Sequence, residues 1–260
     1  MTTPAVSPDP NRLGGLGWTR RTGGALTRKQ RARLLGEIVK GQTAYVGTRI
    51  RLATGRVPEA ARALSIDDVT PPDSRLAREA EEAAREQTPG VIGHSYRSWV
   101  FGAALAGLDG QALDREQFYV ASLLHDYGLM AAVAGEDFTI RSAARAARCG
   151  ESCGTPAPVV DAIGDAITVH SLPGAQLERD GALGFYLQAG ALVDLVGIRA
   201  DELPKAFRDA AIARYDRGGV TQEITRLIAA EAKANPAGRF HLLHRCGFSA
   251  LIRIAPLTPR

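Results

Sequence analysis

The stretch Leu123–Leu129, Leu-Leu-His-Asp-Tyr-Gly-Leu, places a histidine beside an aspartate in an apolar run. Apolar runs of this kind belong to protein interiors, where an unpaired ionisable group is costly to bury. A bound metal ion would offset that cost for His125 and Asp126 together. The remaining ligands of such an ion must then come from other parts of the chain.

His94 and Asp194 are the candidates for those ligands, because each lies in or beside an apolar helical pattern. Neighbouring residues on a helix point about 100° apart. His125 and Asp126 can therefore share an ion only if it lies between their two directions, which leaves room for two more side chains and for water. A mixed nitrogen and oxygen shell with positions left for water is typical of a catalytic metal site.

Such a shell predicts one divalent transition metal ion per chain, with Zn favoured and Mn, Fe or Co as alternatives. An ion of this kind lowers the pKa of a bound water and supplies a nucleophile near neutral pH. Each residue alone has a simpler interpretation. His94 or His170 would be a core histidine, and Asp194 a buried aspartate that accepts hydrogen bonds, so the hypothesis depends on their occurrence together.

Helices must position these residues, because apolar residues recur at helical spacing and show no sustained alternation typical of strands. We therefore predict an all-α fold. Thr27 with Gln30 and Asp114 with Gln117 match helix-start patterns, the first before a basic amphipathic helix and the second before the helix that carries His125. The expected helices of the main body cover residues 74–87, 93–107, 114–130, 137–149, 157–170, 181–196, 202–215, 220–233 and 238–250.

Composition divides the chain into three segments. Residues 1–25 are rich in Pro, Gly and Thr and are expected to form a flexible arm, with Trp18 as an anchor onto the body. Residues 26–73 contain the basic helical extension and end in a break at two prolines. Residues 74–260 are expected to form a single helical globule that contains the site.

Positive charge is concentrated at the front of the chain. Residues 1–63 contain 12 Lys and Arg against 3 Asp and Glu, whereas residues 64–260 contain 20 against 25. A basic segment can bind nucleic acid or an acidic partner, but a solvated helix face is the simpler interpretation, and we do not favour nucleic acid as a partner. The amphipathic pattern of the segment also allows a homodimer.

Composition also bears on the cellular compartment. No apolar stretch approaches the length of a membrane-spanning helix, and the N-terminus lacks the basic start and apolar run of a secretory signal. We therefore expect a cytoplasmic protein without a membrane partner. The three cysteines, Cys149, Cys153 and Cys246, form no paired framework, so we expect reduced thiols rather than disulfides or a zinc knuckle.

Four motifs resemble, in order and in local sequence, the HD-domain superfamily of metal-dependent hydrolases, and more narrowly its cyanamide-hydratase-like branch. That branch has Asn-His-Ser-x-Arg, Leu-His-Asp-hydrophobic-Gly, Ala-Ile-x-x-His and Gly-Ala-x-x-Asp stretches. The corresponding stretches of this chain are Gly93-His94-Ser95-Tyr96-Arg97-Ser98-Trp99, Leu123-Leu124-His125-Asp126-Tyr127-Gly128-Leu129, Asp165-Ala166-Ile167-Thr168-Val169-His170 and Ala189-Gly190-Ala191-Leu192-Val193-Asp194-Leu195-Val196-Gly197. The resemblance runs from about Ser74 to about Arg199, and more loosely to Pro256.

The resemblance implies an all-helical HD-type domain in which His94, His125, Asp126 and Asp194 are the metal ligands. It also implies that His170 faces the substrate and moves a proton to or from the reacting group, so that His170 and Asp126 would be catalytic residues. A small-molecule substrate would lie against this site.

The sequence departs from the branch at Gly93, where an asparagine is usual. The missing amide could orient a ligand or substrate, so the departure bears on the substrate and leaves the metal ligands unchanged. Arg97, three residues after His94, and Asp165, five residues before His170, are candidate substrate-binding residues. A structural salt bridge for Arg97, and an exposed position or support of a ligand for Asp165, are the alternatives.

Three functions fit these patterns. The first, implied by the resemblance, is a hydrolase or hydratase in which metal-activated water attacks a nitrile-type carbon of a small molecule. The second is a phosphohydrolase acting on a nucleotide or another phosphate ester, which would need several cations around the phosphate. Its candidate cations are Arg97, Arg141, Arg145 and Arg199. The third is a non-catalytic module that binds a ligand or partner. A small apolar pocket would favour the first function over the second.

Overall fold

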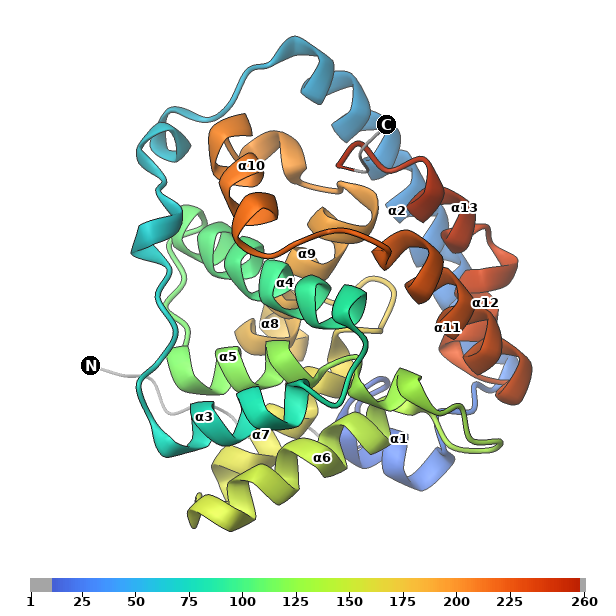
Figure 1. Ribbon diagram of the computed structural model, residues 1–260. Helices are drawn as coiled ribbons and strands as arrows, with labels where there is room; N and C mark the ends of the chain where they lie inside the picture. Colours follow the sequence, from blue (N-terminus) through green and yellow to red (C-terminus); the bar gives the residue numbers. More distant parts are fainter. Residues whose placement is uncertain (1–10, 258–260) are drawn as a thin grey trace.

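The computed structural model describes residues 11–257, which form helices and no β-sheet (Figure 1). Within that range, an isolated bridge between Val133 and Glu136 is the only strand-like pairing. The all-α prediction is therefore confirmed. The α-helices are α1 (Leu16–Thr22), α2 (Arg28–Thr54), α3 (Arg75–Ala84), α4 (Pro89–Leu108), α5 (Arg115–Leu124), α6 (Phe138–Cys153), α7 (Ala157–Val169), α8 (Leu177–Asp180), α9 (Ala182–Val196), α10 (Lys205–Arg214), α11 (Val220–Ala234), α12 (Arg239–Arg245) and α13 (Phe248–Arg253). Short 3₁₀ helices are η1 (Glu59–Ala63), η2 (Ile66–Asp68), η3 (Tyr127–Met130) and η4 (Ala200–Glu202).

Helix α4 lies at the centre of the fold and packs most extensively against α9 (Figure 1). The two backbones approach closely at Gly190, where a Cβ atom would lie 2.0 Å from the Ser98 carbonyl oxygen, and at Gly102, where it would lie 2.5 Å from the Tyr186 carbonyl oxygen. Only glycine fits this close contact. It brings the side of α4 that carries His94 against α9.

The sequence located most helix starts correctly. Thr27 forms a reciprocal capping box with Gln30, and the Asp114 carboxylate accepts a hydrogen bond from the Gln117 backbone N–H at 2.9 Å. The predicted helices differ most from the structure at two places. The helix expected over 114–130 ends at Leu124, and the one expected over 238–250 is divided into α12 and α13 at Gly247, whose φ of 85° interrupts a helix.

The flexible arm expected over residues 1–25 needs correction for residues 11–25. Here α1 packs against α6 and α7, and Trp18, the predicted anchor, is buried. Arg12 donates from Nη1 to Asp180 Oδ1 at 2.7 Å and pairs with Asp165. Proline and glycine content suggested disorder, but Trp18 and the two ion pairs of the buried Arg12 attach this segment to the body. Residues 1–10 lie outside the described range.

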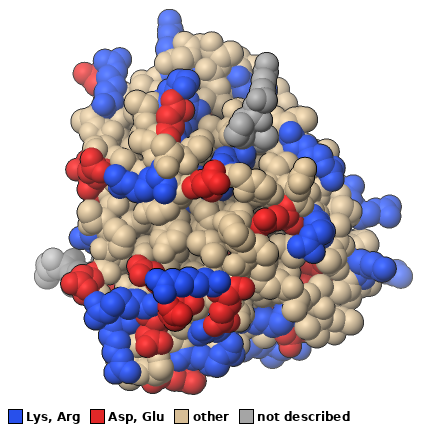
Figure 2. Space-filling model, viewed as in Figure 1, with Lys and Arg blue, Asp and Glu red and all other residues tan. Residues whose placement is uncertain are grey.

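Helix α2 lies along the outside of the body, next to α12 (Figure 1). It buries Leu34, Ile38 and Tyr45 on its inner side. Its outer side exposes four aliphatic residues, Leu35, Val39, Val46 and Ile50. On the face shown in Figure 2, basic and acidic side chains alternate most densely at the lower left, and uncharged residues cover the middle. Among residues 11–257, no helix combines the length and apolar character needed to cross a bilayer, and the three cysteines are free thiols.

Candidate metal centre

Three residues of the predicted site converge in the interior, at a place where a metal ion could bind. His94 Nε2 lies 3.3 Å from His125 Nε2 and 3.6 Å from Asp126 Oδ2, and His125 Nε2 lies 3.4 Å from the same carboxylate oxygen. One ligand atom of each residue is within 4.8 Å of the others. His94 and His125 are fully buried, and Asp126 is only 3% exposed. Such closeness of buried donor atoms is what a shared cation requires.

The break after α5 is what turns His125 and Asp126 to the same side. Asp126 leaves the helical conformation, with φ −101° and ψ 3°, and η3 follows. This turn is held by α6: the Gly128 N–H donates to Ser142 Oγ at 2.8 Å, and Arg141 donates to the Gly128 carbonyl oxygen. A Cβ atom at Gly128 would lie 1.9 Å from the Phe138 carbonyl oxygen, so glycine is required here.

The two imidazoles are oriented by acceptors behind them. His125 Nδ1 lies 2.7 Å from the Ser122 carbonyl oxygen, and His94 Nδ1 lies 2.8 Å from Asp194 Oδ2. A carbonyl or an ionised carboxylate can only accept, so each Nδ1 carries a proton, and in the neutral form of each ring Nε2 offers its lone pair to the cluster. Metal-binding histidines usually have this arrangement, in which the second ring nitrogen donates to a carboxylate or carbonyl group.

Burial and neighbouring charges act differently on the members of the cluster, and His125 is the one imidazole whose proton a metal ion would have to displace. Burial lowers the pKa of His94 and of His170, so both imidazoles are neutral near pH 7. Burial acts against the charge of Asp126, but His125 and His170 outweigh it and hold the pKa of Asp126 well below its usual range. For His125, burial is outweighed by the Asp126 carboxylate, which raises the pKa of His125. Two imidazole nitrogens and one carboxylate therefore fit a divalent transition metal.

His170 lies beside this cluster, at the end of α7. Its Nε2 is 3.5 Å from Asp126 Oδ1, the carboxylate oxygen on the other side from His94. Its Nδ1 faces the Ile167 carbonyl oxygen, which leaves Nε2 as the atom that can take up or release a proton. The ring packs edge-on against Phe138, with centroids 5.8 Å apart.

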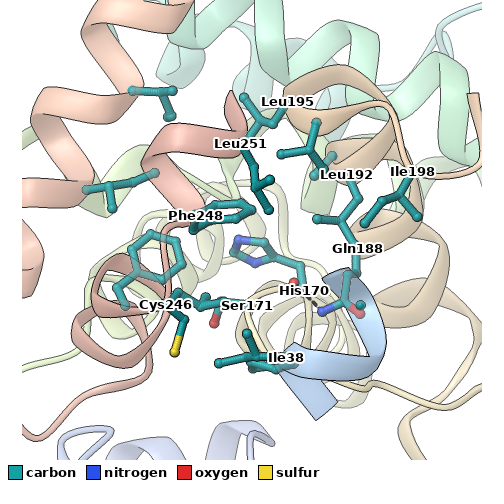
Figure 3. Close-up of a pocket in the computed structure, with 18 of the residues that line it drawn as sticks. Ile38, His170, Ser171, Gln188, Leu192, Leu195, Ile198, Cys246, Phe248 and Leu251 are labelled. Carbon is teal, nitrogen blue, oxygen red and sulfur yellow. Dashed lines mark hydrogen bonds between the residues drawn. The ribbon is translucent and has the colours of Figure 1, made fainter. Parts of the chain in front are cut away.

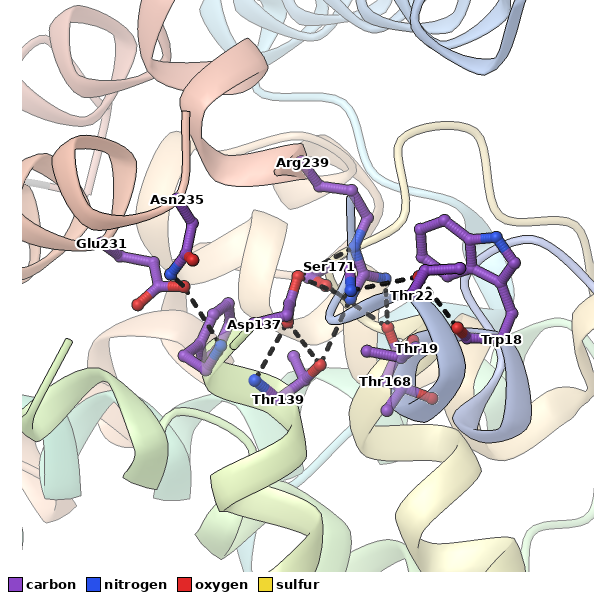
Figure 4. A network of polar contacts seen from close by, with 12 residues as sticks. Trp18, Thr19, Thr22, Asp137, Thr139, Thr168, Ser171, Glu231, Asn235 and Arg239 are labelled. Carbon is purple, nitrogen blue, oxygen red and sulfur yellow. Dashed lines mark hydrogen bonds and ion pairs between the residues drawn. The ribbon is translucent and has the colours of Figure 1, made fainter. Parts of the chain in front are cut away.

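A buried polar network holds the end of α7 that carries His170 (Figure 4). Arg239 is fully buried and donates from Nη1 to the Thr168 carbonyl oxygen at 2.8 Å. Its guanidinium also pairs with Asp137 at 3.0 Å and lies over the Trp18 ring, 5.6 Å from the ring centroid. The predicted anchor Trp18 therefore contacts the network that positions His170.

Asp194 does not join the three converging ligand atoms and lies behind His94. Its Oδ2 faces His94 Nδ1 and accepts from Arg97 Nη2 at 2.9 Å, while its Oδ1 accepts from Arg97 Nε at 2.7 Å and Arg217 Nε at 3.2 Å. Burial would raise the pKa of Asp194, but these charged donors hold that pKa far below its usual range. Both carboxylate oxygens of Asp194 are therefore engaged by these donors, and Asp194 contacts His94 on the side of the imidazole away from the cluster.

Arg97, a candidate substrate-binding residue, forms the buried ion pair with Asp194 that was its alternative in the sequence analysis. Its side chain is fully buried, and besides Asp194 it donates to the carbonyl oxygens of Tyr215 and Asp216. The same loop explains Gly93: a Cβ atom there would lie 2.3 Å from the Asp216 carbonyl oxygen. An asparagine at position 93 would collide with the loop, so the departure from the motif accommodates the loop that supplies Arg217.

Asp165 also lies away from the cluster. Its carboxylate pairs with Arg12 and accepts a hydrogen bond from the Leu16 backbone N–H at 2.9 Å. It therefore attaches α1 to α7, and the geometry gives it no contact with a substrate at the histidine cluster. The sequence shows only that Asp165 lies five residues before His170. This spacing fits a substrate contact as well as a structural ion pair, so the sequence could not distinguish the two.

The cluster opens into a pocket with mainly apolar walls (Figure 3). Its volume is about 140 Å³, close to the roughly 150 Å³ of an apolar cavity that accepts one benzene molecule. The imidazole of His170 points into it, and no Lys or Arg of the described residues lines it. The apolar side chains of the lining are Ile38, Leu129, Pro173, Ala191, Leu192, Leu195, Val196, Ile198, Ile224, Ile228, Phe240, Leu243, Cys246, Phe248 and Leu251. The polar ones, apart from the cluster, are Glu37, Gln42, Ser171 and Gln188.

Sequence reasoning missed three residues that support the site: Arg217, Arg239 and Gln188. Gln188 donates from Nε2 to the carbonyl oxygens of His170 and Leu172. It is a polar residue in an apolar helix six positions before Asp194, and this signal could have been noticed. Arg217 and Arg239 follow turn residues and look like exposed charges in the sequence, although both are buried.

Comparison with known proteins adds no family. A scan against models of protein families finds no match to this chain, and a search of curated proteins finds none either. The class that the fold and site define is an all-helical protein with a buried His-His-Asp group that could bind a metal ion.

Proposed function

We propose that this protein is an HD-type metal-dependent hydrolase or hydratase, similar to the cyanamide-hydratase-like branch, that acts on a small neutral molecule. One observation carries the proposal. The convergent nitrogen and carboxylate donors of His94, His125 and Asp126 line a pocket whose described lining contains no Lys or Arg.

His94, His125 and Asp126 would hold the metal, with Asp194 and the Ser122 carbonyl group fixing the two imidazoles. A divalent transition metal, with Zn favoured, would supply Lewis acidity and lower the pKa of water at the site. Neutral imidazoles and an ionised carboxylate are the protonation states that such an ion needs.

His170 would move the proton in this reaction. In the hydration of a nitrile-type carbon, the oxygen of one water bonds to carbon, both protons of that water end on nitrogen, and no group leaves. His170 Nε2, 3.5 Å from Asp126 Oδ1, faces the pocket and can accept a proton from the water and return it to the nitrogen. The apolar walls limit competing water around the reacting group.

The phosphohydrolase alternative has less support. A phosphate ester needs several cations, but each candidate arginine has other partners: Arg97 pairs with Asp194, Arg141 with Glu136 and Glu231, Arg145 with Glu86, and Arg199 with Asp109 and Glu202. Glu37 and Asp126 on the lining would in addition repel an anionic substrate.

The homodimer and the cytoplasmic location remain predictions. The exposed aliphatic side of α2, formed by Leu35, Val39, Val46 and Ile50, is the surface through which a second copy would dock. Sedimentation velocity of the full chain tests the dimer. A role as a binding module without catalysis is the outcome if the metal experiment fails.

Elemental analysis of the purified protein is the test of the metal site. We expect close to one transition metal per chain, and its loss in Asp126→Asn. Asp161→Asn is the matched control, because Asp161 is exposed on α7 and lies outside the cluster. Conversion of cyanamide to urea, compared with hydrolysis of nucleoside monophosphates, then tests the reaction. A wild type that takes up no metal after incubation with Zn, Mn, Fe and Co would remove the basis for catalysis.

A further inference from the structure

The part of the pocket away from the metal cluster is an apolar chamber that the proposed reaction on cyanamide does not use. Five helices contribute to its walls, among them α2 with Ile38, α9 with Leu192 and Leu195, α11 with Ile228, and the C-terminal helices with Phe240 and Leu251. Figure 3 shows these walls around the His170 side chain. Apolar walls of this extent favour a ligand that itself has an apolar part.

Helix α2 lines one side of this chamber with Ile38 and Gly41 and with the polar residues Glu37 and Gln42. The neighbours of Gly41 on the inner side of the helix, Ile38 three residues before and Tyr45 four residues after, are buried against the body. Gly41 lines the pocket, and yet a Cβ atom there would meet no atom within 4 Å. Its φ is not positive, so the backbone does not require glycine. A glycine inside a helix is unfavourable relative to alanine, and here its effect is to leave space in the chamber.

The polar groups next to the cluster act as hydrogen-bond acceptors. Gln188 uses its amide N–H groups on the carbonyl oxygens of His170 and Leu172, at 2.8 Å and 2.6 Å, which leaves only its amide oxygen for a ligand. The Ser171 hydroxyl donates to the Thr168 carbonyl oxygen, so its oxygen is free only to accept. These two acceptors favour a ligand that carries N–H donors.

We propose that the site takes a neutral molecule with two parts: a head with N–H donors, placed near His170, Ser171 and Gln188, and an apolar substituent that occupies the chamber under α2. Gly41 is then a specificity-determining residue, because the space at this position sets the length of the substituent. An N-alkyl cyanamide, hydrated to an N-alkyl urea, is a substrate of this class. The reacting end depends on the proposed function, whereas the binding preference does not.

Calorimetric titration of the full chain with methylurea, propylurea, butylurea and hexylurea tests the chamber. Affinity should rise by about fourfold for each added methylene until the chamber is full. Butyl acetate has the same number of heavy atoms as butylurea and no N–H, and it should bind about tenfold more weakly or worse. Affinity that does not change with chain length, or equal binding of butyl acetate, would overturn the proposal.

Gly41→Leu should remove the gain of the longer ureas while keeping the binding of methylurea. Gly36→Leu is the matched control, since Gly36 is also in α2 with no atom within 4 Å of its Cβ position but does not line the pocket. Gly41→Ala, a smaller change, should shorten the preferred chain by less than Gly41→Leu. Circular dichroism verifies that all three variants fold. Equal chain-length profiles in Gly41→Leu and Gly36→Leu would refute the role of Gly41.

The two proposals fail in distinguishable ways. Tight binding of butylurea without turnover of any cyanamide would contradict the proposed function and leave the chamber assignment standing. Turnover of cyanamide without any effect of chain length on affinity would contradict only the chamber assignment.

Discussion

The substitution Asp194→Asn separates two roles for this aspartate, which the motif resemblance makes a metal ligand and the structure places behind His94. The carboxylate accepts four side-chain hydrogen bonds, one from His94, two from Arg97 and one from Arg217. An amide has one oxygen, so it can serve the donors on one side only. Its NH₂ group would then face the N–H donors of the arginines on the other side.

Both stability and metal affinity should therefore fall, by different amounts. Removing one partner of a fully buried ion pair costs about 3–5 kcal/mol of unfolding free energy, and Arg97 and Arg217 would both lose their counter-charge. His94 can still donate to the amide oxygen, so metal affinity should fall by about 10- to 100-fold, the usual effect of changing a residue that orients a ligand. Urea unfolding followed by tryptophan fluorescence measures the first quantity, and competition with a chelating dye measures the second.

Asp165→Asn is the control, because Asp165 pairs with Arg12 away from the cluster. It should lower stability by less and leave metal affinity unchanged. Complete loss of metal in Asp194→Asn, with the fold retained, would show that Asp194 is a direct ligand. Unchanged metal affinity would refute the argument that its hydrogen bond to His94 orients the imidazole.

Three further predictions concern pH and packing. The Asp126 carboxylate raises the pKa of His125 despite burial, so protons compete with the metal for this imidazole. Metal affinity, measured by chelator competition, should therefore fall as pH falls through that raised pKa. A flat profile from pH 8 to pH 5 would contradict this. Gly190→Ala should lower the free energy of unfolding by about 1–3 kcal/mol, because the new Cβ would lie 2.0 Å from the Ser98 carbonyl oxygen. Gly107→Ala, whose Cβ would meet no atom within 4 Å, should raise it by about 0.5–1 kcal/mol in the same urea assay. Equal effects of the two substitutions would refute the close contact of α4 and α9. Burial acts to raise the pKa of Asp137, but Arg239 and Thr139 outweigh it and lower that pKa. The stability that this carboxylate contributes is therefore complete above the ordinary aspartate pKa of 3.8 and is lost as pH falls further. Asp137→Asn should reduce this loss of stability at acid pH in urea unfolding, and an unchanged dependence of stability on pH would count against it.

Helix positions and the members of the cluster could be predicted because they depend on local signals. The Thr27 and Asp114 caps and the spacing of apolar residues determine where helices begin. His125 and Asp126 were recognisable because two ionisable groups in an apolar run need a common explanation. Such signals can be read within a window of a few residues.

The sequence could not decide between the alternatives for Asp194 and Arg97, because their partners come from distant segments. Arg97 reaches the carbonyl oxygens of Tyr215 and Asp216, more than a hundred positions later in the chain. Its distance from His94 in the sequence fits either a substrate contact or a support of Asp194. The same loop contributes Arg217, which no local pattern distinguishes from an exposed charge.

The basic front of the chain shows why a boundary in composition need not be a boundary in packing. Residues 26–73 differ in charge from the rest, yet Ile38, Gly41 and Gln42 of α2 line the pocket, and Trp18 of α1 lies against Arg239. Removal of residues 1–63 would therefore take away one wall of the site together with the positive charge. Loss of activity after such a deletion would not identify the front as a partner-binding segment. Replacement of exposed basic residues such as Arg33 removes positive charge and leaves α2 in place. Such variants therefore test partner binding by the charge without removing the pocket wall that α2 provides.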